Sequence, residues 1–189
     1  MGFLTRDAAE ALGFAELGSN VLISDRASFY GTKHIKIASN VRIDDFCVLS
    51  AGERGIEIGS YVHIAVGALL IGAGKITLSD FSGISSKVSI YSSSDDYTGE
   101  ALTNPTVPSK FTKVNHDDVF LGKHVIIGSG SVILPGVKLE EGVAVGALSL
   151  IHKDCHAFGI YAGNPAKRIK ERKKDLLHLE QQLLADITE

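Results

Sequence analysis

Two histidines in this sequence stand where a proton-transfer group could work. His63, in the segment YVHIA, is the last residue of a six-residue repeat, so its side chain points outward from the core that the repeat builds. His116, in VNHDDV, is followed by Asp117 and Asp118, and either carboxylate could orient the imidazole as in a catalytic triad. Both are candidate general bases. The alternatives are an ordinary interface histidine for His63 and a solvent-exposed loop residue for His116.

Asp95 and Asp96 form a second candidate group. They could act as a base, as the partner of a histidine, or as acceptors of hydrogen bonds from sugar hydroxyls. An unperturbed carboxylate is a weak base at neutral pH, so the partner role is favoured. If the attacking group is an amine, it needs no strong base, and the two aspartates could suffice.

A six-residue period of aliphatic side chains predicts the fold that positions these groups. A small residue, such as Val41 or Ser131, recurs at the fifth place of most repeats, and Asn40 and Gly130 fall at the fourth, where the chain bends. Such coincident periods are typical of an all-β solenoid, a parallel β-helix of hexapeptide repeats with three short strands in each coil. The aliphatic positions are Ile37, Ile43, Leu49, Ile58, Ile64, Leu70, Leu78, Ile84, Ile90, Leu121, Ile127, Ile133, Leu139, Val145 and Ile151.

The repeat also divides the chain into parts. Regular coils run from residue 37 to 90 and resume from 121 to about 154. Residues 91–120 lack the period and predict a long excursion loop, and such loops on a regular scaffold are usually functional. Residues 165–189 carry aliphatic residues at helical spacing and predict a C-terminal α-helix that caps the open end of the solenoid. Residues 1–164 are then the β-helix domain.

Composition excludes several classes of partner. A net charge of -3 with 22% charged residues gives no reason to expect nucleic acid. No apolar run approaches the ~20 residues that span a bilayer, and the N-terminus, MGFLTRDAAEALGF, is charged where a secretion signal is apolar. We therefore expect a soluble cytoplasmic protein. Cys47 and Cys155 take the small inward place of a repeat, so they are interpreted as core residues, and an acyl-cysteine mechanism is disfavoured. His34, His124 and His178 are interpreted as surface residues.

The C-terminal third resembles a known family. The segments HVIIGSGSVILPGVKLEEGVAVGALSLIHKD and GIYAGNPAKRIK resemble the end of the hexapeptide-repeat acetyltransferases, which finish with G-x-P-A-[KR]. The chain is similar to the maltose and galactoside O-acetyltransferases and to the acetyltransferases of bacterial surface-polysaccharide synthesis. The resemblance covers about residues 37–172. It implies a left-handed parallel β-helix, a homotrimer, and acetyl-CoA bound as co-substrate between neighbouring solenoids, with no metal.

The resemblance also implies positions for coenzyme and acceptor. In this family the general base is a histidine at the start of the excursion loop, and here Asp95 takes that place. His63 corresponds to a region that meets the reacting groups from the neighbouring subunit. Lysine and arginine residues crowd into the segment 167–174. This basic segment is either a solvated helix face or a site for the coenzyme phosphates. The matching coenzyme positions are Ser129, Ala147, His152 and Lys153 for the pantetheine and nucleotide, and Lys167 and Lys170 for the phosphates.

Two acceptors follow from this reading. The main expectation is an acetyl-CoA-dependent acetyltransferase acting on a sugar hydroxyl, in lipopolysaccharide or capsule synthesis. The alternative is N-acetylation of a nucleotide-linked amino sugar. A non-catalytic scaffold and a γ-class carbonic anhydrase are less favoured, because the three zinc-binding histidines of the latter have no evident match. The acceptor sugar, the acylated carbon and the general base stay open.

Overall fold

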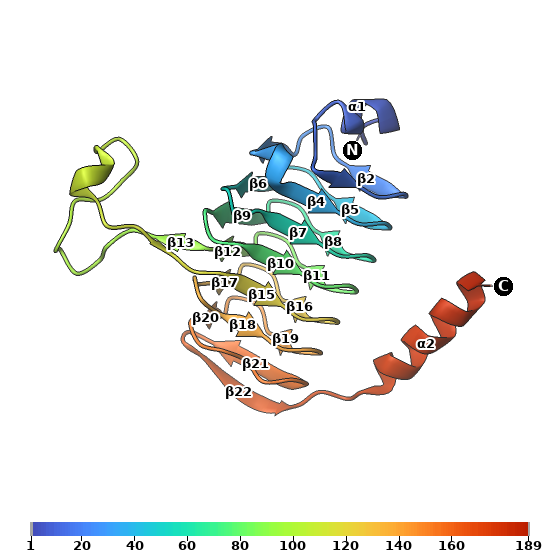
Figure 1. Cartoon of the computed structure of the whole chain (residues 1–189). Helices are drawn as coiled ribbons and strands as arrows, with labels where there is room; N and C mark the ends of the chain where they lie inside the picture. The colour runs from blue at the N-terminus through green and yellow to red at the C-terminus, as the bar shows by residue number, and fades with distance from the viewer. Residues whose placement is uncertain (1, 189) are drawn as a thin grey trace.

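The repeat folds into a solenoid of three parallel β-sheets around one core (Figure 1). The computed structural model describes residues 2–188. Sheet 1 contains β1 (Glu16–Leu17), β4 (Ile35–Ile37), β7 (Ile56–Ile58), β10 (Ile76–Leu78), β15 (Val119–Leu121) and β18 (Lys138–Leu139). Sheet 2 contains β2 (Val21–Ile23), β5 (Val41–Ile43), β8 (His63–Ile64), β11 (Gly83–Ile84), β16 (Ile126–Ile127), β19 (Ala144–Val145), β21 (Gly159–Gly163) and β22 (Ala166–Glu171). Sheet 3 contains β3 (Ser28–Tyr30), β6 (Val48–Ala51), β9 (Leu69–Gly72), β12 (Ser89–Tyr91), β17 (Val132–Ile133) and β20 (Leu150–Ile151).

The aliphatic residues of the repeat stack in the interior. Ile37 pairs in register with Ile58, and Leu78 pairs with Leu121, so equivalent side chains of successive coils lie over one another. Every position of the period is buried, which confirms the predicted hexapeptide β-helix. Cys47 and Cys155 are buried as predicted. Loss of solvation raises the pKa of both thiols, that of Cys155 to about 11.

Residues with positive φ form the corner between sheets 1 and 2. Asn40, Tyr61, Phe81 and His124 take φ values of 60°, 59°, 59° and 61°. The ring of Phe81 stacks between the other two rings, with centroid distances of 4.8 Å to Tyr61 and 5.1 Å to His124. The corner therefore presents a ladder of stacked rings on its outer surface.

The helix α2 (Asp175–Thr188) docks on this ladder. Glu180 Oε2 lies 2.7 Å from His124 Nε2, and Glu180 Oε1 accepts a hydrogen bond from Lys123 Nζ. Leu176 and Leu183 line the hollow between helix and ladder. The expectation of a surface residue at His124 is wrong, because the docked helix leaves its side chain only 9% exposed.

A β-hairpin, and not the predicted helix, closes the last coil. Residues 166–171 of the predicted helix 165–189 form β22, which pairs antiparallel with β21. That part of the prediction is wrong because β21 would otherwise leave a row of unpaired backbone groups at the sheet edge. The helix begins only at Asp175, and it runs back beside the solenoid without capping its end (Figure 1).

Residues 92–118 leave the solenoid between β12 and β15 and project from it (Figure 1). The predicted loop, 91–120, is too long at both ends, because Tyr91 ends β12 and Val119 begins β15. At the base of this loop β13 (Ser93–Ser94) pairs antiparallel with β14 (Asn115–His116), and a 3-10 helix, η2 (Ser109–Phe111), lies further out. The strands on either side still stack, since β10 pairs with β15 and β12 pairs with β17. The loop thus interrupts the sequence without interrupting the sheets.

The N-terminal segment covers the first coil. The helix α1 (Arg6–Glu10) is capped by Thr5, whose hydroxyl accepts from Ala8 N at 3.3 Å, and Ala9 packs into the core. A second 3-10 helix, η1 (Thr32–His34), precedes β4. Within residues 2–188 no helix is long and apolar enough to cross a membrane.

Candidate functional site

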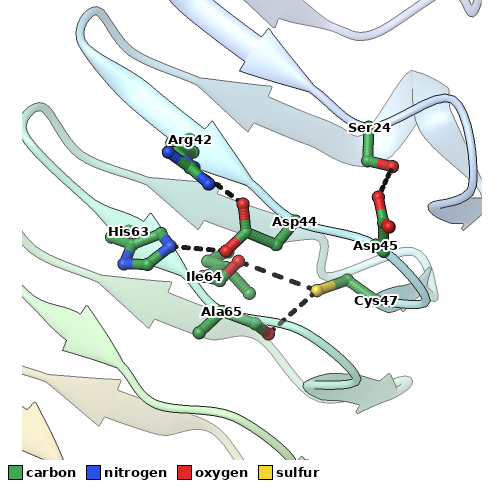
Figure 2. A network of polar contacts seen from close by, with 8 residues as sticks. All are labelled: Ser24, Arg42, Asp44, Asp45, Cys47, His63, Ile64 and Ala65. Atoms are coloured by element: carbon green, nitrogen blue, oxygen red, sulfur yellow. Dashed lines mark hydrogen bonds and ion pairs between the residues drawn. The ribbon is translucent and has the colours of Figure 1, made fainter. Parts of the chain in front are cut away.

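A hydrogen-bonded network on the outer face of sheet 2 contains the first candidate base (Figure 2). His63 begins β8, and its Nε2 lies 2.8 Å from Asp44 Oδ2. Arg42, in β5, donates from Nε to Asp44 Oδ1 at 2.7 Å. Arg42 and His63 are register partners on adjacent coils, and Asp44 directly follows β5. The stacking of coils therefore brings the three side chains together.

The carboxylate of Asp44 favours one tautomer of the His63 imidazole. Burial of Asp44 acts to raise its pKa, but the hydrogen bonds from Arg42 and His63 outweigh this and hold the pKa below its usual value. An anionic acceptor beside Nε2 favours the tautomer with its proton on Nε2 and leaves Nδ1 as the accepting nitrogen. The side chain of His63 is 52% exposed. Its arrangement suits a general base that faces a ligand at the surface.

His63 also lines a hollow on the outer face of sheet 2, with a volume of about 300 Å³. Ser129, a predicted coenzyme residue, lines the same hollow, so the structure brings one predicted catalytic and one predicted coenzyme residue together. The other residues that line it include Gly83, Ser85, Ser86 and Ile126.

Sequence reasoning missed Arg42, Asp44, Ser85 and Ser86. The available signal was the period itself: Arg42 pairs with His63 from the preceding coil, and Ser85 directly follows β11, whose Gly83 pairs with His63 from the following coil. The hexapeptide period therefore contains the information that places these neighbours around His63.

A larger hollow, of about 530 Å³, lies on the outer face of sheet 1. Its lining includes Lys36, Glu57, Asp80 and Lys123 but none of the predicted site residues. Glu57 pairs with Lys75 at 2.8 Å and with Lys36 at 3.9 Å. We do not assign a reaction to this surface, because its charges neutralise one another.

Four of the six predicted coenzyme residues lie along sheet 2 and its corner with sheet 3. Ser129 and Ala147 are exposed on successive coils at this corner, where Leu148 N donates to Ser129 O at 2.9 Å. Lys167 and Lys170 pair with Ala162 and Ile160, and a bulge in β22 places both lysines on the same face. Two cations thus stand at the C-terminal end of the surface that Ser129 begins.

The other two lie elsewhere. His152 and Lys153 follow β20, at the corner between sheets 3 and 1, beside a small hollow of about 50 Å³ that Cys155 and Tyr161 also line. The structure therefore does not bring His152 and Lys153 together with Ser129, Ala147 and the two lysines of β22 within one chain.

The loop aspartates differ from one another. Asp96 is engaged inside the loop, where its carboxylate accepts from the hydroxyl of Thr98 at 2.7 Å and from the backbone N–H groups of Thr98 and Ala101. These hydrogen bonds, that of the Thr98 hydroxyl foremost, lower the pKa of Asp96 to about 2. Asp95 is exposed at the base of the loop. Asp95 is thus the better placed of the two to meet a substrate.

His116 has a different partner from the one predicted. Its Nδ1 lies 2.7 Å from Ser93 Oγ across the β13–β14 ladder. Asp117 accepts from the side chain of Asn115, and Asp118 accepts from Arg54 Nη2 at 2.7 Å. The prediction that Asp117 or Asp118 orients the imidazole is therefore wrong in this structure, because Asp117 bonds to Asn115 and Asp118 bonds to Arg54 of another segment.

Within one chain the candidate catalytic residues lie on two different faces. His63 belongs to sheet 2, whereas Asp95, Asp96 and His116 belong to the loop that leaves between sheets 3 and 1 (Figure 1). The described residues, 2–188, contain no cluster of three or more His, Cys, Asp or Glu side chains that could hold a metal ion.

Comparison with known proteins gives close matches over the whole chain, although no family model matches. The chain is 56% identical over 180 residues to the dTDP-4-amino-4,6-dideoxy-D-glucose acyltransferase of Escherichia coli, covering 95% of this chain and 94% of that protein. A serine-to-alanine variant of AntD, an N-acyltransferase from Bacillus cereus, solved with dTDP-4-amino-4,6-dideoxyglucose and coenzyme A, has a TM-score of 0.94 at 42% identity over 98% of each chain.

A second structure of AntD, in complex with dTDP and 3-hydroxybutyryl-CoA, also has a TM-score of 0.94 at 42% identity, over 99% of this chain and 98% of that one. A maltose O-acetyltransferase from Clostridium difficile shares the fold alone, with a TM-score of 0.59 at 18% identity over 89% of this chain and 74% of that one. These likenesses confirm that the solenoid is a left-handed β-helix.

Proposed function

The chain belongs to the hexapeptide-repeat acyltransferases, and on that premise we propose that it transfers an acyl group from coenzyme A to the amino group of dTDP-4-amino-4,6-dideoxyglucose. The observation that supports this acceptor is the 56% identity to an acyltransferase of that sugar, over 94% of the length of that enzyme. Acyl transfer itself was predicted and is confirmed. Of the two predicted acceptors, the nucleotide-linked amino sugar is better supported than the sugar hydroxyl.

An amine acceptor fits the chemistry of the candidate residues. The free amine attacks the thioester carbonyl carbon, a C–N bond forms, the C–S bond breaks, and coenzyme A leaves as the thiol after taking up the proton that nitrogen loses. An amine is already a good nucleophile once it is unprotonated, so no strong base is needed before attack. The absence of the family's loop histidine, replaced by Asp95, is then no obstacle.

We assign the proton-handling role to His63 and the positioning of the ammonium to Asp95. His63 has an accepting Nδ1 and an anionic partner in Asp44. The AntD structures include variants of one serine and of one aspartate ten positions later. In this chain the same spacing joins Ser85, beside His63 in the hollow, to Asp95 in the loop, which supports a common site.

A homotrimer is the proposed working unit. His63 and Asp95 lie on different faces of one chain, so the two can serve one substrate only if a neighbouring copy supplies the loop. The loop itself exposes apolar side chains, Tyr97, Leu102 and Phe111, that its own solenoid does not cover. Light scattering should give three times the chain mass, and a monomer with full activity would exclude this arrangement.

For the donor, we propose that Ser129 and Ala147 line the pantetheine arm and that Lys167 and Lys170 meet the coenzyme phosphates. His152 and Lys153 join this site only across a subunit boundary, since they lie at another corner of their own chain. We further propose that the protein acts in the cytoplasm and supplies an acylated sugar nucleotide for surface-polysaccharide synthesis. The role in polysaccharide synthesis is tested by deleting the gene and measuring the sugar nucleotides of the strain, which should lack the acylated one.

A paired-acceptor assay tests the function directly. Purified protein is incubated with acetyl-CoA or 3-hydroxybutyryl-CoA and with either dTDP-4-amino-4,6-dideoxyglucose or dTDP-6-deoxyglucose, which carries a hydroxyl in place of the amine. Thiol release should appear only with the amino sugar, and mass spectrometry should find an amide. Turnover of the hydroxyl sugar at a comparable rate would return the assignment to O-acylation.

A further inference from the structure

Gly83 stands apart from every other glycine in the chain. Ten glycines have positive φ, where a side chain is strained. At each of the remaining glycines except Gly83, a neighbouring atom lies within 3.0 Å of the place a Cβ would take. At Gly83 that place meets only Ile126 Cγ1, at an ordinary contact distance of 3.8 Å. Neither the backbone nor the packing therefore requires a glycine at this position.

The missing side chain at Gly83 opens the hollow on sheet 2. Gly83 pairs with His63 on one side and with Ile126 on the other, and it lies between their side chains on the outer face of the sheet. A side chain at this position would enter the hollow. A glycine in a strand interior weakens the strand, so the use of Gly83 lies in the space it leaves.

We propose that this hollow holds the acyl chain of the thioester donor beyond its carbonyl carbon, and that Gly83 sets the length of chain the enzyme accepts. The inference rests on the proposed acyl transfer. The hollow extends from His63, the candidate group at the reacting centre, to Ser129, on the coenzyme side. The thioester sulfur joins the carbonyl carbon to the coenzyme on the Ser129 side, and the acyl chain continues from the same carbon into the space beside His63 and Gly83.

The lining of the hollow indicates the kind of acyl chain. A volume of about 300 Å³ equals on the order of ten waters of the liquid, far more than the methyl group of acetyl fills. Ile126 offers an apolar wall, while Ser85, Ser86 and Ser129 offer hydroxyl groups. A short chain with a hydroxyl group, of the 3-hydroxyacyl class, satisfies both.

Calorimetric titration of Gly83→Ala with 3-hydroxybutyryl-CoA, acetyl-CoA and free coenzyme A tests this, because binding needs no acceptor. One methyl group in a fitted pocket changes discrimination by about tenfold or more. The variant should bind 3-hydroxybutyryl-CoA about tenfold more weakly than wild type, and acetyl-CoA and coenzyme A within about twofold of wild type. Gly83→Val should abolish the preference for the longer chain.

Ser89→Thr is the matched control, because it adds one methyl group to the outer face of sheet 3 in the same coil. It should leave all three affinities unchanged.

Equal weakening of all three ligands by Gly83→Ala, or weakening of the sugar nucleotide alone, would place another group in the hollow and overturn the inference while acyl transfer stands. If wild type binds neither acyl-CoA nor coenzyme A, the proposed function fails with it. Thermal unfolding at or above the wild-type temperature shows that the variant is folded.

Discussion

At the scale of single residues, the proposed reaction uses the ring nitrogen of His63 that does not bond to Asp44. Asp44 Oδ2 lies 2.8 Å from Nε2, which leaves Nδ1 as the accepting nitrogen of the proposed base. His63→Ala should lower kcat about 10²-fold near neutral pH, because a positioned base contributes ~10²–10⁴ in rate. The deficit should shrink as pH rises, because more of the amino sugar is then unprotonated. Steady-state rates between about pH 6 and pH 9 measure this.

Asp44→Asn is the companion variant, since it preserves shape but removes the anionic partner of the imidazole. Its kcat should fall less than that of His63→Ala, with an unchanged KM for the donor. If His63→Ala keeps full kcat while Asp95→Asn loses it, proton transfer belongs to the loop, and His63 is an interface residue.

The lysine pair of β22 gives a second prediction at this scale. Lys167→Ala combined with Lys170→Ala should raise KM for acyl-CoA about tenfold and leave KM for the sugar nucleotide unchanged, because both lysines share one face at the end of the surface proposed for the coenzyme. The matched control is Lys33→Ala with Lys36→Ala, which removes equal charge near the other end of the solenoid. A parallel rise of both KM values would indicate general damage.

At the scale of elements, α2 is held to the solenoid by Glu180. Its burial acts to raise its pKa, but the hydrogen bonds from Lys123 and His124 outweigh this, so the pKa of Glu180 is lowered in the docked state. A lowered carboxyl pKa contributes stability that is complete above the undocked pKa of about 4.3. That stability is lost as pH falls through the lower pKa of the docked state.

Glu180→Gln should therefore reduce the amide-exchange protection of α2 at neutral pH, by about 1 kcal/mol, and leave β-helix amides unaffected. Below about pH 4 the protection of wild type should converge on that of the variant. Asp186→Asn, which removes a carboxylate at an exposed position of the same helix, serves as the control. Equal protection in wild type and Glu180→Gln at neutral pH would show that the apolar contacts alone hold the helix.

The sequence predicts the three sheets, but it does not predict the strand β22 or the docking of α2. The sheets follow from the period, because a repeat of six admits only one set of inward positions. The strand β22 does not follow, because Lys167 to Lys170 reads equally well as a helix face and only the open edge of β21 decides. The Glu180–His124 contact spans 56 residues, a pairing that no local pattern contains. The candidate site is similar: His63 was found, but its partners Asp44 and Arg42 required the coil register.

At the scale of the whole molecule, the core is one continuous stack. Ile127 is fully buried between Ile84 and Val145. Ile127→Asp should abolish soluble folded protein, because it places an unpaired carboxylate in a dry interior. Ile127→Val should fold with a loss of only about 1 kcal/mol. Circular dichroism and gel filtration of both variants measure this, and a soluble, active aspartate variant would refute the assigned register.

The stacking of β10 on β15 and of β12 on β17 across the loop has a consequence for how such a protein can change through descent. The chain can leave the solenoid at a corner, form a loop of any length, and re-enter with the next strand in the same place. Length and composition of that excursion are thus free to vary by insertion, deletion or exchange without a compensating change in any sheet. New acceptor preferences can be acquired by replacing one segment, while the surface proposed for the coenzyme is inherited intact.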